Sequence, residues 1–200
     1  MARSPRHHPG LTAYLARHGQ TEWNVAGRRQ GRLDSPLTPL GLGQAHRNAR
    51  LLTGAGIDAV YASPLGRALT TARVIASHLG LRVEVLDDLA ELDHGDWSGL
   101  DSAAIDARWP GERERRSRDK YTYRFPGGES YADASVRAAR VLDEIGRTGV
   151  LRPLIVSHEM IGRLLLHCLG VADALDTQQP SDVVYRVRAG VAVDRLPSSG

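Results

Sequence analysis

The sequence predicts an α/β fold, a three-layer α/β/α sandwich with a mostly parallel central sheet. Short apolar segments typical of strands alternate along the chain with segments of ten to twenty residues that have helical periodicity and helix caps. The segment 153–156 is purely apolar, which is typical of a strand covered on both faces. Together these observations favour parallel strands connected by helices.

The first half of the chain supplies three of the predicted strands. Residues 11–17 form a strand that ends in a turn at Gly19, and 58–62 and 82–86 form the next two. Two helices separate them. Thr38-Pro39 gives an N-cap followed by proline at the first helical position of a helix to about residue 53, and Ser63-Pro64 repeats the pattern before a helix over 65–79.

The second half completes the sandwich. Ser130 and Asp133 resemble a capping box that opens a helix through residue 145. The strand 153–156 follows, then a helix over 160–169. Two segments at the end, 183–188 and 191–196, form a predicted hairpin around Gly190.

The stretch 93–128 departs from this alternation. It is polar and rich in glycine and charge, and one short helical piece is expected at 103–108. We interpret 93–128 as an insertion over the carboxyl edge of the sheet that contributes to substrate binding.

The composition is that of a globular protein. With 200 residues, 42% hydrophobic and 24% charged, residues 11–197 are expected to form a single domain after a disordered leader at 1–10. That leader has no hydrophobic segment of a signal peptide, and no apolar run is long enough to span a bilayer. The single cysteine, Cys168, excludes an internal disulfide and favours a cytoplasmic location.

The net charge of +3 raises the question of nucleic-acid binding. Basic residues are scattered, however, and the one dense cluster, at 113–120, alternates arginine with acidic side chains and lacks aromatic residues between them. We therefore interpret the cluster as a solvated face and expect neither a nucleic-acid nor a membrane partner. A homodimer is one assembly that the sequence leaves open.

Three groups of polar residues directly follow predicted strands. They are Arg17-His18-Gly19, the segment 63–67 and Ser157-His158. In open α/β sheets, ligands bind beyond the carboxyl ends of the strands. The sequence therefore predicts a site at this edge that contains two histidines and two arginines.

The motifs around these groups resemble those of the histidine phosphatase superfamily, the phosphoglycerate-mutase-like proteins. The resemblance follows the family's order over about residues 11 to 190. The matching segments are 17–24 (RHGQTEWN), 27–31, 36–38, 63–68 (SPLGRA), 89–99 (LAELDHGDWSG), 128–130 and 156–158 (VSH).

This resemblance implies a metal-free phosphatase without a cofactor that acts on a small phosphorylated substrate. His18 corresponds to the nucleophile, Glu91 to the general acid and base, and His158 to a group beside the phosphate. The other residues that the resemblance places in substrate binding are Arg17, Asn24, Gln30 and Arg67. For Asn24 the alternative is that it only caps a short helix.

The proposed roles agree with the chemistry of phosphoryl transfer. Negative charge spreads over three oxygens in the transition state, so catalysis depends on positioning and charge neutralisation. Arginine binds phosphate oxygens two at a time and stays protonated. The same positive field is expected to lower the pKa of His18 and keep it nucleophilic, with its other ring nitrogen fixed by an acceptor such as a backbone carbonyl.

Glu159 departs from the family pattern. Many members have glycine directly after the second histidine, and another branch uses an acidic residue there as the proton donor. Glu91 is the first choice for the donor because its surrounding segment matches the glutamate-donor branch, and Glu159 is the alternative.

The short insertion favours hydrolysis over mutase-type transfer, because the cofactor-dependent mutases carry extra sequence that keeps water from the phosphoenzyme. The segment 119–131 also partly resembles fructose-2,6-bisphosphatase domains, in which residues matching Arg116 and Lys120 bind a second phosphate, although Ser102 replaces a sugar-binding tyrosine. A substrate with a second anionic group is therefore a hypothesis. The alternatives are a phosphoglycerate-mutase-type reaction and a non-catalytic module that binds a phospho-ligand or a protein.

Overall fold

The computed structural model describes residues 10–188 and 192–198. Its sheet has six strands in the order β3-β2-β4-β1-β5-β6. The first four run parallel, and β5 and β6 join antiparallel at the β1 edge. The strands are β1 (Thr12–Arg17), β2 (Ala59–Ala62), β3 (Val83–Val85), β4 (Pro153–Ser157), β5 (Val183–Arg188) and β6 (Ala192–Pro197). The predicted mostly parallel sheet is confirmed.

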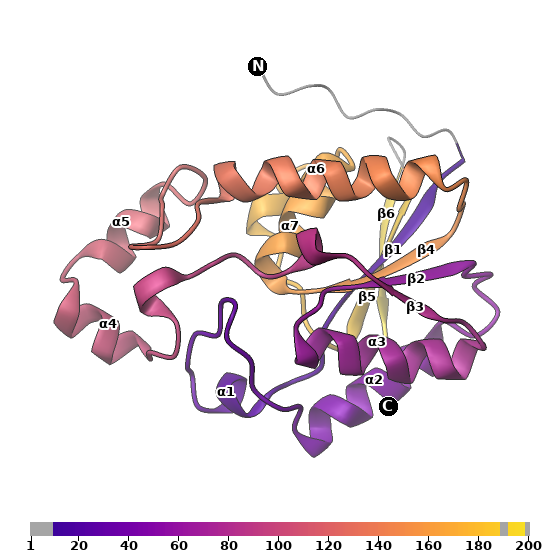
Figure 1. The fold of residues 1–200 in the computed structure, drawn as a ribbon, viewed down its shortest axis with the longest axis horizontal. Helices are drawn as coiled ribbons and strands as arrows, with labels where there is room; N and C mark the ends of the chain where they lie inside the picture. The colour runs from indigo at the N-terminus through magenta and orange to yellow at the C-terminus, as the bar shows by residue number, and fades with distance from the viewer. Residues whose placement is uncertain (1–9, 189–191, 199–200) are drawn as a thin grey trace.

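Helices cover both faces of the sheet, with α6 and α7 on one side and α2 and α3 on the other (Figure 1). Successive residues of each strand point to opposite sides, so two apolar cores form. Leu15 and Ile155 belong to the core under α6 and α7, whereas Ala16 and Val156 belong to the core under α2 and α3. The α-helices are α1 (Glu22–Val25), α2 (Pro39–Leu51), α3 (Gly66–Leu79), α4 (Ser102–Arg108), α5 (Glu112–Arg118), α6 (Tyr131–Arg147) and α7 (Glu159–Cys168).

Three single-turn 3-10 helices lie in the connections: η1 (Asp87–Leu89), η2 (Gly95–Trp97) and η3 (Ala174–Asp176). Two predicted caps are present. The Thr38 side chain accepts from the Gly41 N–H at the start of α2, and Ser130 and Asp133 form a complete capping box on α6. Residues 1–9 of the predicted leader (1–10) and the hairpin turn at Gly190 lie outside the described residues.

Two predictions about local structure are wrong. Ser63 does not cap α3: the helix begins after Leu65, which makes no side-chain cap bond. Where one short helical piece was expected, the segment 93–128 contains two α-helices, α4 and α5, besides the 3-10 helix η2; α4 and α5 lie beyond the sheet at the left of Figure 1. The sequence of α5 is almost entirely charged, so it lacks the apolar periodicity that would predict a helix.

Among the described residues, no helix combines the length and apolar character that crossing a membrane requires.

Candidate active site

His18 follows β1 and is 3% exposed. Its backbone N–H donates to the Ser157 carbonyl at 3.0 Å, which holds the ends of β1 and β4 together. Its Nδ1 lies 2.7 Å from the Gly19 carbonyl oxygen. Because a carbonyl can only accept, Nδ1 carries the proton and Nε2 keeps its lone pair. The predicted backbone anchor for this ring is therefore present, and Nε2 is the nitrogen able to attack.

Arg67, from the first turn of α3, points its guanidinium at that nitrogen. Its Nε donates to His18 Nε2 at 3.3 Å. The remaining guanidinium nitrogens are fixed from the loop before α2, by the carbonyls of Gly31 and Leu33 and by the carboxylate of Asp34 at 2.9 Å. With a side chain only 1% exposed, Arg67 is a rigid cation next to His18.

His158 lies between β4 and α7, at the N-cap of that helix, and is fully buried. The centroids of its ring and the His18 ring are 5.2 Å apart. Its Nε2 is hydrogen-bonded to Ser63 Oγ at 2.7 Å, so Ser63 orients a histidine of the site instead of capping a helix. Its Nδ1 is buried and has no partner among the described residues.

Both histidines are held in the neutral form. Burial is the largest cause and lowers the pKa of His18 well below its usual value, and the charges of Arg17 and Arg67 lower it further. Burial likewise lowers the pKa of His158, followed by the charge of Arg67. The expected neutral nucleophile therefore has both a desolvation and an electrostatic basis.

Glu91 is buried at the N-terminus of α7. Its Oε1 accepts from the N–H groups of Leu92 and Ile161 at 2.9 and 3.1 Å, and its Oε2 accepts from the Met160 N–H at 3.2 Å. A helix N-terminus favours such a carboxylate because its N–H groups have no intrahelical partner. Glu91 and His158 are thus both fixed by the same end of α7.

Arg137 on α6 binds the backbone of the segment that directly precedes Glu91. Its guanidinium donates to the carbonyl oxygens of Asp88 and Ala90, both at 2.6 Å, and pairs with Glu129 at 3.1 Å. Glu129 in turn accepts from the Asp93 N–H at 2.9 Å. The Gly128-Glu129-Ser130 motif therefore contributes support for Glu91 and the start of α6.

Arg17, the last residue of β1, is half-buried beside the histidines. Its Nη1 lies 2.9 Å from Glu159 Oε2 and donates to the Gln179 carbonyl at 3.3 Å. The other Glu159 oxygen pairs with Arg163 at 2.6 Å. Glu159, the alternative proton donor, is thus engaged by two arginines, whereas Glu91 is bound by backbone N–H groups alone.

Asn24 and Gln30 lie close to Thr21. Asn24 completes a capping box at α1, where its Oδ1 accepts from the Thr21 N–H at 3.0 Å. This oxygen therefore caps the helix, as the alternative for Asn24 predicts. Its Nδ2 remains available as a donor. Gln30 is buried and donates to Thr21 Oγ1 at 2.9 Å. For both residues, substrate binding stays a prediction.

The two residues predicted to bind a second phosphate, Arg116 and Lys120, contact different parts of the structure. Arg116 is half-buried, stacks over the Phe125 ring at 5.1 Å and reaches the Met160 sulfur at 3.8 Å. Lys120 forms an ion pair with Asp176 of η3. Binding of a second phosphate by this pair stays a prediction.

Sequence reasoning missed several residues that build the site. Ser63 was assigned to a cap, and Gln179, Arg163 and Arg137 were not singled out. Each makes a contact with a residue at least fourteen positions away in the chain, so no local pattern in the sequence indicates it. His94 is 5% exposed and stacks on Phe125, with 4.6 Å between the ring centroids.

Comparison with known proteins places this arrangement in a family. The model of the histidine phosphatase superfamily, branch 1, matches residues 13–181. A probable phosphoglycerate mutase, GpmB, from Yersinia pestis is 39% identical over 166 residues, which cover 80% of this chain and 76% of that protein.

Solved structures agree. A mycobacterial glucosyl-3-phosphoglycerate phosphatase in complex with VO3 superimposes with a TM-score of 0.83 at 29% identity, covering 94% of this chain and 100% of that one. The alpha-ribazole phosphatase of Shigella flexneri gives a TM-score of 0.81 at 26% identity, covering 94% and 96%. The chain therefore belongs to branch 1 of the histidine phosphatase superfamily.

Proposed function

We propose that this histidine phosphatase hydrolyses a small phosphorylated metabolite through a phosphohistidine intermediate at His18. The observation that carries the proposal is the pairing of a neutral His18, whose Nδ1 is anchored on Gly19, with Arg67, whose Nε donates to the unprotonated His18 Nε2 at 3.3 Å. A nucleophile thus lies beside a cation that can bind the group under attack.

In the first step, His18 Nε2 attacks phosphorus and the bond to the leaving oxygen breaks. Arg17 and Arg67 neutralise the phosphoryl oxygens, with His158 beside them. Glu91 supplies the proton to the leaving oxygen. Within the described part of the chain, its Oε2 accepts one hydrogen bond, from the Met160 N–H, which leaves room for a proton on that oxygen.

In the second step, water attacks the phosphohistidine. The Glu91 carboxylate takes a proton from the water as the new oxygen–phosphorus bond forms, and the bond to Nε2 breaks. Inorganic phosphate leaves, and both His18 and Glu91 return to their starting states. No other co-reactant is required for this balance.

Mutase activity is the second candidate, and the 39% identity to a probable phosphoglycerate mutase favours it. A mutase returns the phosphoryl group to the substrate, whereas a phosphatase gives it to water. Supplying a phosphoglycerate and following both its isomer and free phosphate separates the two. We expect phosphate release, because the insertion at 93–128 is short.

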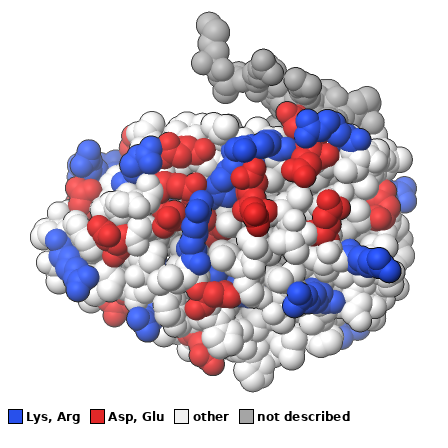
Figure 2. Space-filling view, viewed as in Figure 1, with Lys and Arg blue, Asp and Glu red and all other residues white. Residues whose placement is uncertain are grey.

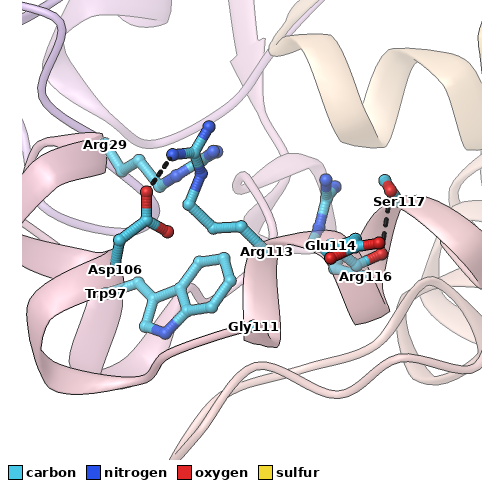
Figure 3. Close-up of a pocket in the computed structure, with 8 residues that line it drawn as sticks. All are labelled: Arg29, Trp97, Asp106, Gly111, Arg113, Glu114, Arg116 and Ser117. Carbon is cyan, nitrogen blue, oxygen red and sulfur yellow. Dashed lines mark hydrogen bonds and ion pairs between the residues drawn. The ribbon is translucent and has the colours of Figure 1, made fainter.

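A pocket beside α5 supports the hypothesis of a second anionic group on the substrate. Arg29, Arg113 and Arg116 line this cavity of about 560 Å³ together with Trp97 and Asp106 (Figure 3). Arg113 pairs with Asp106 at 2.7 Å, but neither Arg29 nor Arg116 has a carboxylate partner among the described residues.

Arg29 and Arg116 are thus two guanidinium groups of the cavity that no carboxylate pairs with among the described residues. Unpaired guanidinium groups in a cavity suit a carboxylate or phosphate. The hypothesis fails if Arg116→Ala combined with Lys120→Ala leaves kcat/KM unchanged for every bisphosphate tested.

We further propose that the protein acts in the cytoplasm without a nucleic-acid partner. Acidic side chains are interspersed with the basic ones on the face shown in Figure 2, and many arginines pair with them, so no basic stripe follows that face. The free thiol of Cys168 is consistent with a reducing compartment.

The experiment that tests the proposal is hydrolysis of p-nitrophenyl phosphate in the presence of EDTA. We expect the rate to persist under chelation and to fall at least about 10³-fold in His18→Ala, because the nucleophile is lost. His46→Ala, an exposed histidine on α2, is the matched control and should keep the rate. Turnover that survives in His18→Ala contradicts the proposal, and no turnover across a broad panel of phosphate esters favours the non-catalytic binding module.

A further inference from the structure

Glu159 places a carboxylate on one of the two arginines of the phosphate site. Its Oε2 lies 2.9 Å from Arg17 Nη1, and it directly follows His158 in the chain. Arg17 lies near both site histidines, since its positive charge lowers the pKa of His18 and of His158. The carboxylate therefore engages a cation that the proposed reaction needs for the phosphoryl oxygens.

Arg163, one turn further along α7, fixes Glu159 in this position. It binds Glu159 Oε1 at 2.6 Å. The Arg163 guanidinium is itself held by the Thr177 carbonyl at 2.8 Å and by the Tyr131 hydroxyl at 3.3 Å. Glu159 is thus shared between a well-anchored arginine and the half-buried Arg17.

Arg17 is less firmly held than Arg67. Arg67 uses its guanidinium on two carbonyls and Asp34 as well as on His18. Arg17 has one hydrogen bond, to the Gln179 carbonyl, besides the Glu159 pair, and its Nε is buried with no partner among the described residues. Of the two arginines, Arg17 is the one with donors left to reorient.

We propose that Glu159 is an internal competitor of phosphate: it occupies Arg17 when the site is empty and yields Arg17 to the phosphoryl group of the substrate. Because like charges near one another raise the free energy of the bound state, the carboxylate weakens the binding of any phosphate dianion. Inorganic phosphate, the product, then leaves more readily. Glu159 is a positioning residue, because it acts through Arg17 and not on the reacting atoms.

The inference rests on the proposed function, but its main test, the binding of inorganic phosphate, does not require turnover. The dissociation constant of phosphate is measured by calorimetry on the whole protein. Its inhibition constant against p-nitrophenyl phosphate is a second measurement, made on turnover. Glu159→Gln keeps the size of the side chain and removes its charge. We expect it to lower both constants about tenfold, with kcat unchanged or reduced where phosphate release limits turnover.

Arg163→Gln supplies the opposite change. Without Arg163, Glu159 pairs with Arg17 alone, so phosphate binding should weaken. The double variant Arg163→Gln, Glu159→Gln should bind phosphate as tightly as Glu159→Gln does, because Arg163 then has no carboxylate through which to act. Glu144→Gln, exposed on α6, removes the same charge elsewhere and should leave the dissociation constant unchanged.

Three results overturn the inference. The first is an unchanged phosphate dissociation constant in Glu159→Gln despite a wild-type melting temperature. The second is a fall in kcat of about 100-fold or more without tighter phosphate binding, which identifies Glu159 as the proton donor. The third is a double variant that binds as weakly as Arg163→Gln. If phosphate binds as expected but no ester is hydrolysed, the proposed function fails while this inference stands.

Discussion

At the scale of single residues, the chemistry of each side chain in the site depends on which of its atoms already form hydrogen bonds. His18 presents an unprotonated Nε2 because the Gly19 carbonyl accepts the proton carried by Nδ1. Glu91 lies in the loop after η1 and Glu159 opens α7, and both place a carboxylate near the start of that helix. Backbone N–H groups bind the Glu91 carboxylate, whereas guanidinium groups bind that of Glu159. The two carboxylates therefore differ in their hydrogen-bond partners, and the role of Glu91 as the proton donor stays a proposal.

The role of Glu91 predicts a dependence on the leaving group. In Glu91→Gln, hydrolysis of an alkyl phosphate should slow by about 10²–10⁴-fold, because its leaving oxygen needs a proton. Hydrolysis of p-nitrophenyl phosphate should slow much less, because p-nitrophenolate leaves without one. The measurement is kcat/KM for both substrates in the variant and the wild type. An equal loss for both would show that the substitution disturbs α7 and does not remove a proton donor.

Some residues of the site could be predicted from the sequence, and others could not. That His18, Arg67 and His158 lie together could be predicted, because each directly follows a strand or opens the next helix within a recognisable motif. Ser63 also lies in a motif, yet its bond to His158 joins residues 95 positions apart, and the Ser-Pro pair looks like a helix cap. Whether a serine caps a helix or binds a distant side chain depends on the fold.

At the scale of secondary-structure elements, the loop after β1 packs backbone to backbone on the start of α2. The Thr38 N–H donates to the Gln20 carbonyl at 2.9 Å, and the Gln20 N–H donates to Gln44 at 2.8 Å. A Cβ on Gly41 would overlap that Gln20 carbonyl. Glycine at 41 therefore lets the loop that carries His18 lie against the helix.

This packing predicts opposite effects for two glycines of α2. Gly41→Ala should destabilise the protein by about 1–3 kcal/mol or more, because backbone atoms cannot move aside, and should reduce activity by displacing the loop. Gly43→Ala meets only a side-chain nitrogen of Arg47 at 3.5 Å and should stabilise the helix by roughly 0.5–1 kcal/mol. Urea denaturation of both variants checks the pair. Equal stability of the two variants would show that the close approach is absent.

Elements differ in how well the sequence predicts them. The strands and α2, α3, α6 and α7 could be predicted because each has an apolar face or a cap that packing also uses. The helix α5 could not, because its residues are charged on all sides and Arg116 is drawn inward by Phe125 and Met160 of other elements. Whether such a segment forms a helix depends on its tertiary contacts.

At the scale of the whole molecule, three of the histidines that the structure describes are buried in the neutral form. Burial lowers the pKa of His94 to about 3, and the charges of Arg29 and Arg116 contribute. It also lowers the pKa values of His18 and His158. In the unfolded chain these groups take up protons near pH 6.5, whereas in the folded protein they do not. Folding is therefore most favourable above about pH 6.5 and loses stability as the pH falls.

The expected size of this loss is about 1.4 kcal/mol per histidine between roughly pH 7.5 and 5.5, or about 4 kcal/mol for the three. In His94→Gln, one of the three no longer titrates, so the loss over this interval should shrink by about 1.4 kcal/mol whatever the absolute stability. Urea denaturation at both pH values measures it. An unchanged difference between the two pH values would show that His94 takes up its proton in the folded state too.

The central claim of a covalent phosphohistidine is tested most directly by rapid-quench labelling with a 32P-labelled phosphomonoester. Quenched in base, the wild-type protein should carry label that is stable to alkali, labile to acid and located on the peptide containing His18, and His18→Ala should carry none. Turnover without labelled protein at any quench time, or label on another residue, would contradict the account.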